Sequence, residues 1–168
     1  ESLSIVPMLA MGNAMSTFTA QNMGAGKIDR VKEGYRMCYV IVLTAGAVLC
    51  IMYQLAGGAF VSLFLDSGSS EAYSVGLSYV KFLSFFYSFI GLKASTDGLL
   101  RGAGDVTAFT VANLVNLAIR VSVTNLFAPI YGIQVAWMAV PLGWAANYVI
   151  SFGWYLTGKW KKVRVIKK

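Results

Sequence analysis

The sequence predicts an all-α integral membrane protein with five membrane-spanning helices. Of its 168 residues, 57% are hydrophobic and only 12% are charged, whereas soluble domains carry about 25% charged residues. The charges are also grouped, and they leave apolar runs of roughly 20 residues, the length that a helix needs to cross a bilayer core. The mean hydropathy of +0.65 agrees with this class and argues against a water-soluble domain.

The first three predicted spans are separated by polar segments. No charged residue lies between Ser2 and Gly26, which predicts a first span over residues 4–21. Residues 37–65 are again uncharged, and they predict a second span over residues 35–56. A turn rich in serine and glycine follows, and the third span covers residues 73–95.

The last two spans share one long apolar run in which Arg120 is the single charge. Proline and glycine interrupt helices, so Pro129 and Gly132 divide this run into spans over residues 107–127 and 133–156. Residues 1–158 then form one transmembrane domain, and residues 159–168 form a basic cytoplasmic tail.

Lysine and arginine residues alternate between the two sides of the predicted membrane. The connections after the first and third spans and the tail are basic, whereas the connections after the second and fourth spans hold no lysine or arginine. Basic segments concentrate on the cytoplasmic side. We therefore expect a multi-pass protein of the cell membrane with a cytoplasmic C-terminus. The net charge of +7 is then explained by topology, and no nucleic-acid partner is expected.

Four of the predicted spans carry polar residues at helical spacing, for which two explanations stay open. Small and hydroxylated residues allow close packing between membrane helices. Alternatively, the residues line a water-accessible cavity that binds a solute. Lys81 and Arg120 favour the cavity, because intramembrane cations usually face an aqueous pathway or a bundle interior, and neither span offers a carboxylate at that depth. The candidate cavity residues are Asn13, Thr17, Lys81, Ser84, Phe85, Ser88, Asn113, Asn116, Arg120, Trp144 and Asn147.

The sequence contains no recognised catalytic or metal-binding constellation, and we expect neither an enzyme nor a metal or cofactor site. It has no histidine. The segment from Gly24 to Lys27 fails as a phosphate loop, because Gln21 and Ile28 stand where glycine and a hydroxyl residue are required. Asp97 follows Lys93 by four residues, which predicts a local ion pair on one helix.

Two loop segments resemble those of multidrug and toxic compound extrusion (MATE) transporters. Gln21-Asn22-Met23-Gly24-Ala25-Gly26-Lys27 resembles the loop after the second helix of each lobe in that family. Leu99-Leu100-Arg101-Gly102-Ala103-Gly104-Asp105 resembles the loop between the fourth and fifth helices of a lobe. We expect the glycines to serve as structural hinges, because glycine permits tight turns at positive φ. The motif residues are Gln21, Gly24, Gly26, Arg101, Gly102, Gly104 and Asp105.

The resemblance covers essentially the whole chain and implies its architecture and activity. MATE proteins are twelve-helix bundles of two six-helix lobes, and this chain is similar to most of a C-terminal lobe, with the other lobe as its missing partner. The family exports cationic or amphipathic organic compounds across the lipid bilayer in exchange for sodium ions or protons, by alternating access.

One departure from the family pattern concerns coupling. Some members carry an acid eleven residues before the loop arginine, a position that Ile90 occupies here. We therefore expect the sodium ion or proton to bind in the missing part of the protein. An alternative function is a flippase for a lipid-linked anionic molecule, because Lys81 and Arg120 would repel a cationic substrate.

Overall fold

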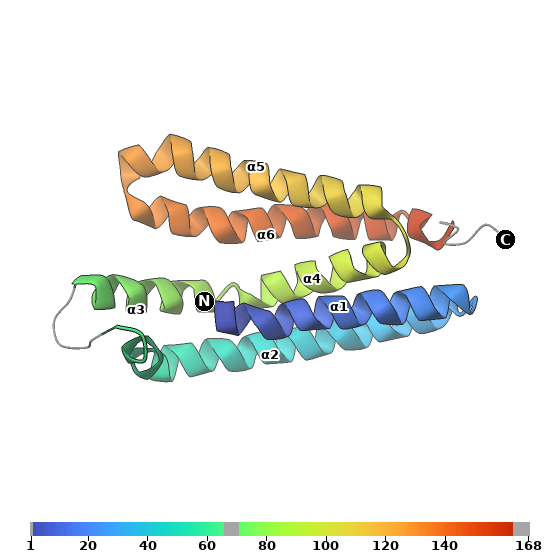
Figure 1. The fold of residues 1–168 in the computed structure, drawn as a ribbon, viewed down its shortest axis with the longest axis horizontal. Helices are drawn as coiled ribbons and strands as arrows, with labels where there is room; N and C mark the ends of the chain where they lie inside the picture. Colours follow the sequence, from blue (N-terminus) through green and yellow to red (C-terminus); the bar gives the residue numbers. More distant parts are fainter. Residues whose placement is uncertain (1, 66–70, 163–168) are drawn as a thin grey trace.

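The computed structural model describes residues 2–65 and 71–162, and every regular element in these ranges is a helix (Figure 1). This confirms the predicted all-α class. The elements are α1 (Ser2–Gly24), α2 (Ile28–Ser62), α3 (Glu71–Ser84), α4 (Tyr87–Gly102), α5 (Val106–Tyr131), α6 (Ile133–Leu156) and the short 3₁₀ helix η1 (Lys159–Lys162).

Helix α4 lies at the centre of the bundle. It packs against α1 and α2 on one side and against α6 on the other, while α5 packs mainly on α6 (Figure 1). The α1–α2 connection and η1 lie at one end of the elongated molecule, and the α5–α6 turn lies at the opposite end. The chain therefore forms two groups of helices that meet along α4 and α6.

Among the described helices, α2, α5 and α6 are each long and apolar enough to cross a membrane. Helices α3 and α4 meet the same criteria as a pair bent by 54°. The predicted spans over residues 4–21, 35–56, 107–127 and 133–156 fall inside α1, α2, α5 and α6. The predicted end at residue 56 coincides with Ala56, whose backbone is non-helical at φ −120° and ψ 15°.

The predicted span over residues 73–95 is two helices in the structure. Helix α3 ends at Ser84 and α4 begins at Tyr87, with Phe85 and Phe86 between them. Neither proline nor glycine marks this break, so the apolar pattern did not reveal it. Helix α4 also continues to Gly102, seven residues beyond the predicted end of the span at residue 95.

Helices α1 and α4 touch through their backbones. A Cβ atom added to Gly98 would lie 2.1 Å from the carbonyl oxygen of Gly12, and one added to Gly102 would lie 2.2 Å from that of Ser16. Small residues allow such close approach between membrane helices. Glycine at these positions therefore fixes the position of α4 against α1.

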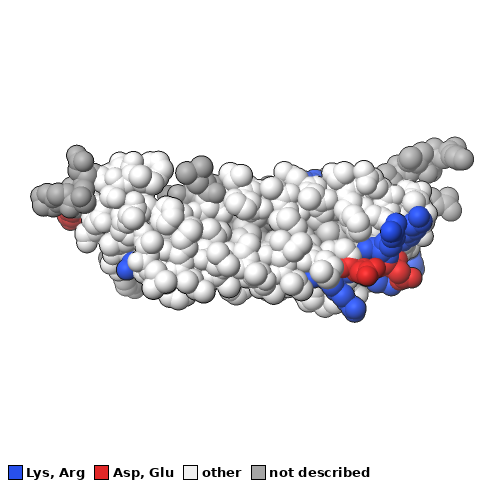
Figure 2. Space-filling model, turned by 90° about the horizontal axis from the view of Figure 1, so that it is seen from below, with Lys and Arg blue, Asp and Glu red and all other residues white. Residues whose placement is uncertain are grey.

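The middle of the molecule presents an apolar surface. Figure 2 shows charged side chains gathered mainly at one end of the visible face, with a white surface between the ends. Large apolar side chains such as Met37, Val48 and Leu55 on α2 and Leu114 and Leu117 on α5 are exposed. A large exposed apolar surface of this kind fits contact with lipid.

Candidate functional site

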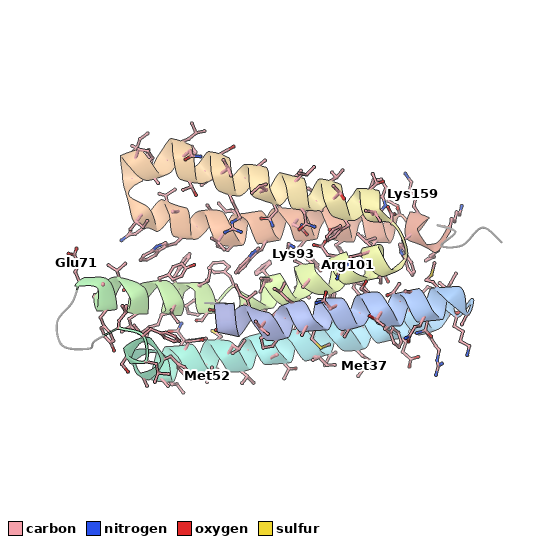
Figure 3. The ribbon with its side chains drawn as sticks, viewed as in Figure 1. Met37, Met52, Glu71, Lys93, Arg101 and Lys159 are labelled. Carbon is pink, nitrogen blue, oxygen red and sulfur yellow. The ribbon has the colours of Figure 1, made fainter. Side chains whose placement is uncertain are left out.

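A buried polar cluster joins α4 to the α5–α6 hairpin, and Figure 3 shows Lys93 between these elements. Asp97 on α4 is only 4% exposed. Its Oδ2 atom accepts hydrogen bonds from Lys93 Nζ at 3.0 Å and from Asn113 Nδ2 at 3.1 Å. Its Oδ1 atom accepts one from Ser151 Oγ at 2.7 Å. We name Lys93, Asp97, Asn113, Asn147 and Ser151 the Asp97 cluster.

Helical spacing explains how these residues meet. Lys93 and Asp97 lie four residues apart on α4, and Asn147 and Ser151 lie four apart on α6, so each pair shares one helix face. Asn113 on α5 accepts a hydrogen bond from Lys93 Nζ at 3.0 Å and donates one to the carbonyl of Phe109 at 2.8 Å. A buried charge is costly without a partner, and the cluster pairs its two charges and surrounds them with polar atoms.

Asn147 is fully buried and only partly satisfied. Ser151 Oγ lies 3.4 Å from Asn147 Oδ1, and Asn147 Nδ2 has no hydrogen-bond partner among the described residues. The Ser151 hydroxyl has a single proton, and its contact with Asp97 Oδ1 at 2.7 Å is the shorter of its two acceptor contacts.

The loop motif that closes α4 connects three other helices. Arg101 donates hydrogen bonds to Asn13 Oδ1 at 2.8 Å and to Ser16 Oγ at 3.4 Å, both on α1. Asp105 accepts one from the backbone N–H of Ala108 at the start of α5, and its other oxygen accepts one from Trp154 Nε1 of α6 at 2.7 Å.

The glycines of the two loop motifs serve different purposes. Gly26 and Gly104 have positive φ angles of 70° and 82°, a backbone conformation that favours glycine. Gly102 instead packs against the α1 backbone, and a Cβ atom at Gly24 would meet nothing within 4 Å. Gln21 contributes its carbonyl oxygen to the turn, where it accepts a hydrogen bond from the Ala25 N–H.

The predicted cavity residues are distributed over several surfaces. Asn113 and Asn147 belong to the Asp97 cluster, and Trp144 is buried nearby on α6. Asn13 and Thr17 are exposed on α1. Their contact with a substrate stays a prediction.

The remaining predicted cavity residues on α3 and α4 lie near α2. Ser84 is buried and accepts a hydrogen bond from Gln54 Nε2 at 3.0 Å. Ser88 packs against Gly46, whereas Phe85 is 63% exposed in the break between the helices. Ser84 and Ser88 thus contact α2, and their place in a substrate cavity stays a prediction.

Asn116 and Arg120 lie along α6 without an acidic partner. A Cβ atom at Gly143 would lie 2.2 Å from Asn116 Oδ1 and 2.9 Å from Arg120 Cγ. Within residues 2–65 and 71–162, the ion pairs are Lys32–Asp29 and Lys93–Asp97, so neither Lys81 nor Arg120 has a carboxylate partner there. Asn116 Oδ1 is buried without a described hydrogen-bond partner.

Sequence reasoning named Lys93, Asp97, Asn113 and Asn147 but did not predict that they form one cluster. It predicted the Lys93–Asp97 pair, which the structure confirms at 3.0 Å, but placed it at the end of a span instead of among three helices. It did not name Ser151 as a site residue, although Ser151 lies one turn after Asn147.

A second polar cluster, of hydroxyl groups, was also not predicted. Thr96 Oγ1 lies 2.7 Å from the Tyr35 hydroxyl and 2.9 Å from that of Tyr39, which donates to Tyr148 at 3.3 Å. This cluster connects α2, α4 and α6 beside the Asp97 cluster.

The fold, the apolar surface and the buried polar cluster define a multi-pass helical membrane protein. The chain belongs to the MatE family, the MATE transporters, whose family model matches residues 1–140. It is 27% identical over 166 residues to the "Probable multidrug resistance protein YpnP" of Bacillus subtilis (98% of this chain and 37% of the relative). It is 21% identical over 177 residues to the "Probable multidrug resistance protein NorM" of Thermotoga maritima (100% of this chain and 36% of the relative).

A solved structure shows the same fold. It is described as the inward-facing conformation of a multidrug resistance MATE family transporter of the MOP superfamily, and it matches with a TM-score of 0.78 and 21% identity. The match covers 90% of this chain and 34% of the other chain. The chain thus spans about a third of the length of the proteins that it matches, in agreement with the expected single lobe.

Proposed function

We propose that this chain is one lobe of a secondary antiporter that exports cationic or amphipathic organic compounds by alternating access. The observation that carries this proposal is the family match over residues 1–140. The relatives named as probable multidrug resistance proteins support the substrate class. The remaining part of such a protein would supply the second lobe, and sodium ions or protons would drive the exchange.

The packing of the lobe supports a movement in which groups of helices shift as units. The glycine contacts hold α1 and α4 together at backbone distance. Arg101 and Asp105 connect the end of α4 to α1, α5 and α6. Packed interfaces of this kind switch between discrete arrangements and do not deform continuously.

The export proposal is tested with the whole protein that carries this chain, expressed in a host without its own efflux pumps. We expect lower accumulation of a cationic dye than in cells with the empty vector, and the difference should disappear when the sodium and proton gradients are removed. Equal accumulation in both cell lines, with the protein present in the membrane, would contradict the proposal.

A flippase for a lipid-linked anion is the second candidate. Lys81 and Arg120 favour it, because both lie in predicted spans without a described carboxylate partner, and intramembrane cations mark functional pathways.

The Arg120→Gln variant separates the two candidates, with Arg120→Lys as the matched control that keeps the charge. A flippase should lose transport of an anionic lipid in Arg120→Gln and keep part of it in Arg120→Lys. An exporter of organic cations should keep dye efflux in both variants. Normal anion transport by Arg120→Gln would exclude the flippase role of this residue.

A further inference from the structure

A groove of about 550 Å³ lies between the end of α1 and the start of α2. The connection between these helices is at one end of the elongated molecule, where Figure 2 shows most of the charged side chains of the visible face. The lining of the groove includes Phe18, Gln21, Lys27, Arg30, Glu33 and Met37. Charged, amide and apolar side chains thus meet in one groove, and the proposed export uses none of the charged ones.

The positive charges of the groove have no described ion-pair partner. Lys27 and Arg30 are exposed, and neither ion pair within residues 2–65 and 71–162 includes a residue of the groove lining. Glu33 is the one acid among the described lining residues. Two cations against one acid leave the groove with a net positive charge, which fits a singly charged anion.

The 3₁₀ helix η1 brings a further positive charge to this end. Trp160 is fully buried, its Nε1 donates to the Tyr155 carbonyl oxygen at 3.1 Å, and the two rings stack at 5.6 Å, which fixes η1 against α6. The hydrogen bond and charge of Lys32 lower the pKa of the Asp29 carboxyl, and the charge of Lys161 on η1 lowers it further. Lys161 is therefore within electrostatic reach of the start of α2, and it adds to the positive potential beside the groove.

An apolar face of α2 continues from the groove toward the middle of the molecule. Met37 follows Arg30 by seven residues and Ile41 follows Met37 by four, so the three share one helix face. Met37 and Ile41 are exposed, and Phe18 on α1 packs against Gly34, where a Cβ atom would lie 2.2 Å from Phe18 Cε1. A free phosphate ion makes no use of apolar surface beside its site, whereas a phospholipid presents an anionic headgroup and acyl chains together.

We propose that this groove binds an anionic phospholipid of the cytoplasmic leaflet. Its phosphodiester would lie between Lys27 and Arg30, and an acyl chain would follow Met37 and Ile41. Anionic lipids of that leaflet attract basic segments at the membrane surface, and the distribution of basic residues predicts that this end faces the cytoplasm. Lysine and arginine place their charge among the headgroups while their stems cover apolar surface. The inference goes beyond the proposed export, because it concerns the membrane partner of the lobe and not its substrate.

The experiment measures lipid retention by the whole protein that carries this chain. The protein is purified in detergent with equal amounts of phosphatidylglycerol and phosphatidylcholine of the same acyl chains, and native mass spectrometry counts the lipids that stay bound. We expect the unaltered protein to retain phosphatidylglycerol in preference, and Arg30→Gln to retain about fivefold less of it. Equal retention of both lipids by the unaltered protein would overturn the inference.

Arg36→Gln is the matched control. It removes the same charge from the same helix, but Arg36 does not line the groove. We expect this variant to retain phosphatidylglycerol as the unaltered protein does. Equal losses in Arg30→Gln and Arg36→Gln would indicate a diffuse attraction to the basic surface, and they would overturn the assignment of a site.

Glu33→Gln covers the case in which Arg30→Gln folds poorly. Loss of the acid removes its repulsion of the phosphodiester, so this variant should retain more phosphatidylglycerol than the unaltered protein, a change that a folding defect does not produce. Unchanged or lower retention by Glu33→Gln, with the helical circular dichroism of the unaltered protein, would contradict the inference.

A further variant separates a lipid from a soluble phosphate. Met37→Asn keeps every charge but interrupts the apolar face, and it should lower the retention of phosphatidylglycerol. An excess of inorganic phosphate should not displace the lipid from the unaltered protein. Displacement by inorganic phosphate, together with normal retention by Met37→Asn, would assign the groove to a soluble anion and overturn the lipid site.

The outcomes for this site and for the proposed function are distinguishable. Lipid retention is measured without any transported compound, so absence of dye efflux would contradict the exporter and leave the lipid site in place. Normal efflux together with equal retention of the two lipids would remove the lipid site and leave the exporter in place.

Discussion

At the residue scale, Asp105 combines two structural tasks in one carboxylate. One oxygen accepts the N–H of Ala108 at the start of α5, and the other accepts the indole N–H of Trp154 at 2.7 Å. Loss of a helix N-cap costs about 1–2 kcal/mol. We expect Asp105→Ala to lower the free energy of unfolding by at least that amount, measured by denaturation in detergent followed by circular dichroism.

Asp29→Ala is the control for this prediction. Asp29 also lies at the start of a helix and pairs with Lys32 at 2.7 Å, but its side chain is exposed. Exposed ion pairs contribute little to stability, so this variant should unfold close to the unaltered protein. Equal destabilisation by both variants would show that Asp105 has no special role.

Individual residues were partly predictable from the sequence. The four-residue spacing was sufficient to predict the Lys93–Asp97 ion pair, because this ion pair depends on the geometry of one helix alone. The participation of Asn113 and Ser151 was not predictable, because it depends on which faces of α5 and α6 turn toward α4. Spacing along a chain says nothing about the rotation of one helix relative to another.

At the element scale, the contact between α1 and α4 depends on glycine. A Cβ atom at Gly98 would lie 2.1 Å from the Gly12 carbonyl oxygen, so Gly98→Ala must push the two helices apart. Overpacking of this kind costs about 1–3 kcal/mol. We expect a clearly lower Tm for Gly98→Ala, measured by thermal unfolding in detergent.

Gly153→Ala on α6 is the matched glycine variant. A Cβ atom there would meet nothing within 4 Å, and alanine in a helix interior is more favourable than glycine by roughly 0.5–1 kcal/mol. Its Tm should therefore stay the same or rise. A similar fall in the Tm of both variants would mean that the lower stability comes from glycine replacement in general and not from the α1–α4 contact.

Most helices could be predicted from the grouping of charges along the sequence, because a membrane crossing requires a long apolar helix. The break at Phe85 and Phe86 did not follow from it, since both residues are apolar and neither interrupts a helix by its own backbone chemistry. Helix α3 packs mainly against α2, and α4 packs against α1, α2 and α6, so the surroundings of the 54° bend come from helices that the sequence of this segment does not contain.

At the scale of the whole molecule, the distribution of basic residues predicts how the chain lies in the membrane. The connection between α1 and α2 and the η1 end should face the cytoplasm, and the turn between α5 and α6 should face outward. Cysteine labelling tests this in a protein whose native cysteines are replaced by alanine. A cysteine from Lys27→Cys should react with an impermeant maleimide only after the cells are permeabilised.

Tyr131→Cys is the counterpart on the other side, and it should react in intact cells. Tyr131 is 68% exposed, and it is preferred to Gly132, whose φ of 83° makes a side chain unfavourable there. The opposite labelling pattern would invert the orientation, and labelling of both positions in intact cells would contradict a fixed topology.

The order in which the ribosome makes the helices gives the Asp97 cluster a further consequence. Lys93 and Asp97 are made together on α4, so each neutralises the other while later helices are still being synthesised. Asn113 emerges afterwards on α5 and Ser151 later still on α6, so the hydrogen bond from Ser151 to Asp97 cannot form until α6 has entered the bilayer. Truncation before Ser151 should therefore leave Asp97 Oδ1 without its hydrogen bond from Ser151, while the charge of Asp97 stays paired with Lys93.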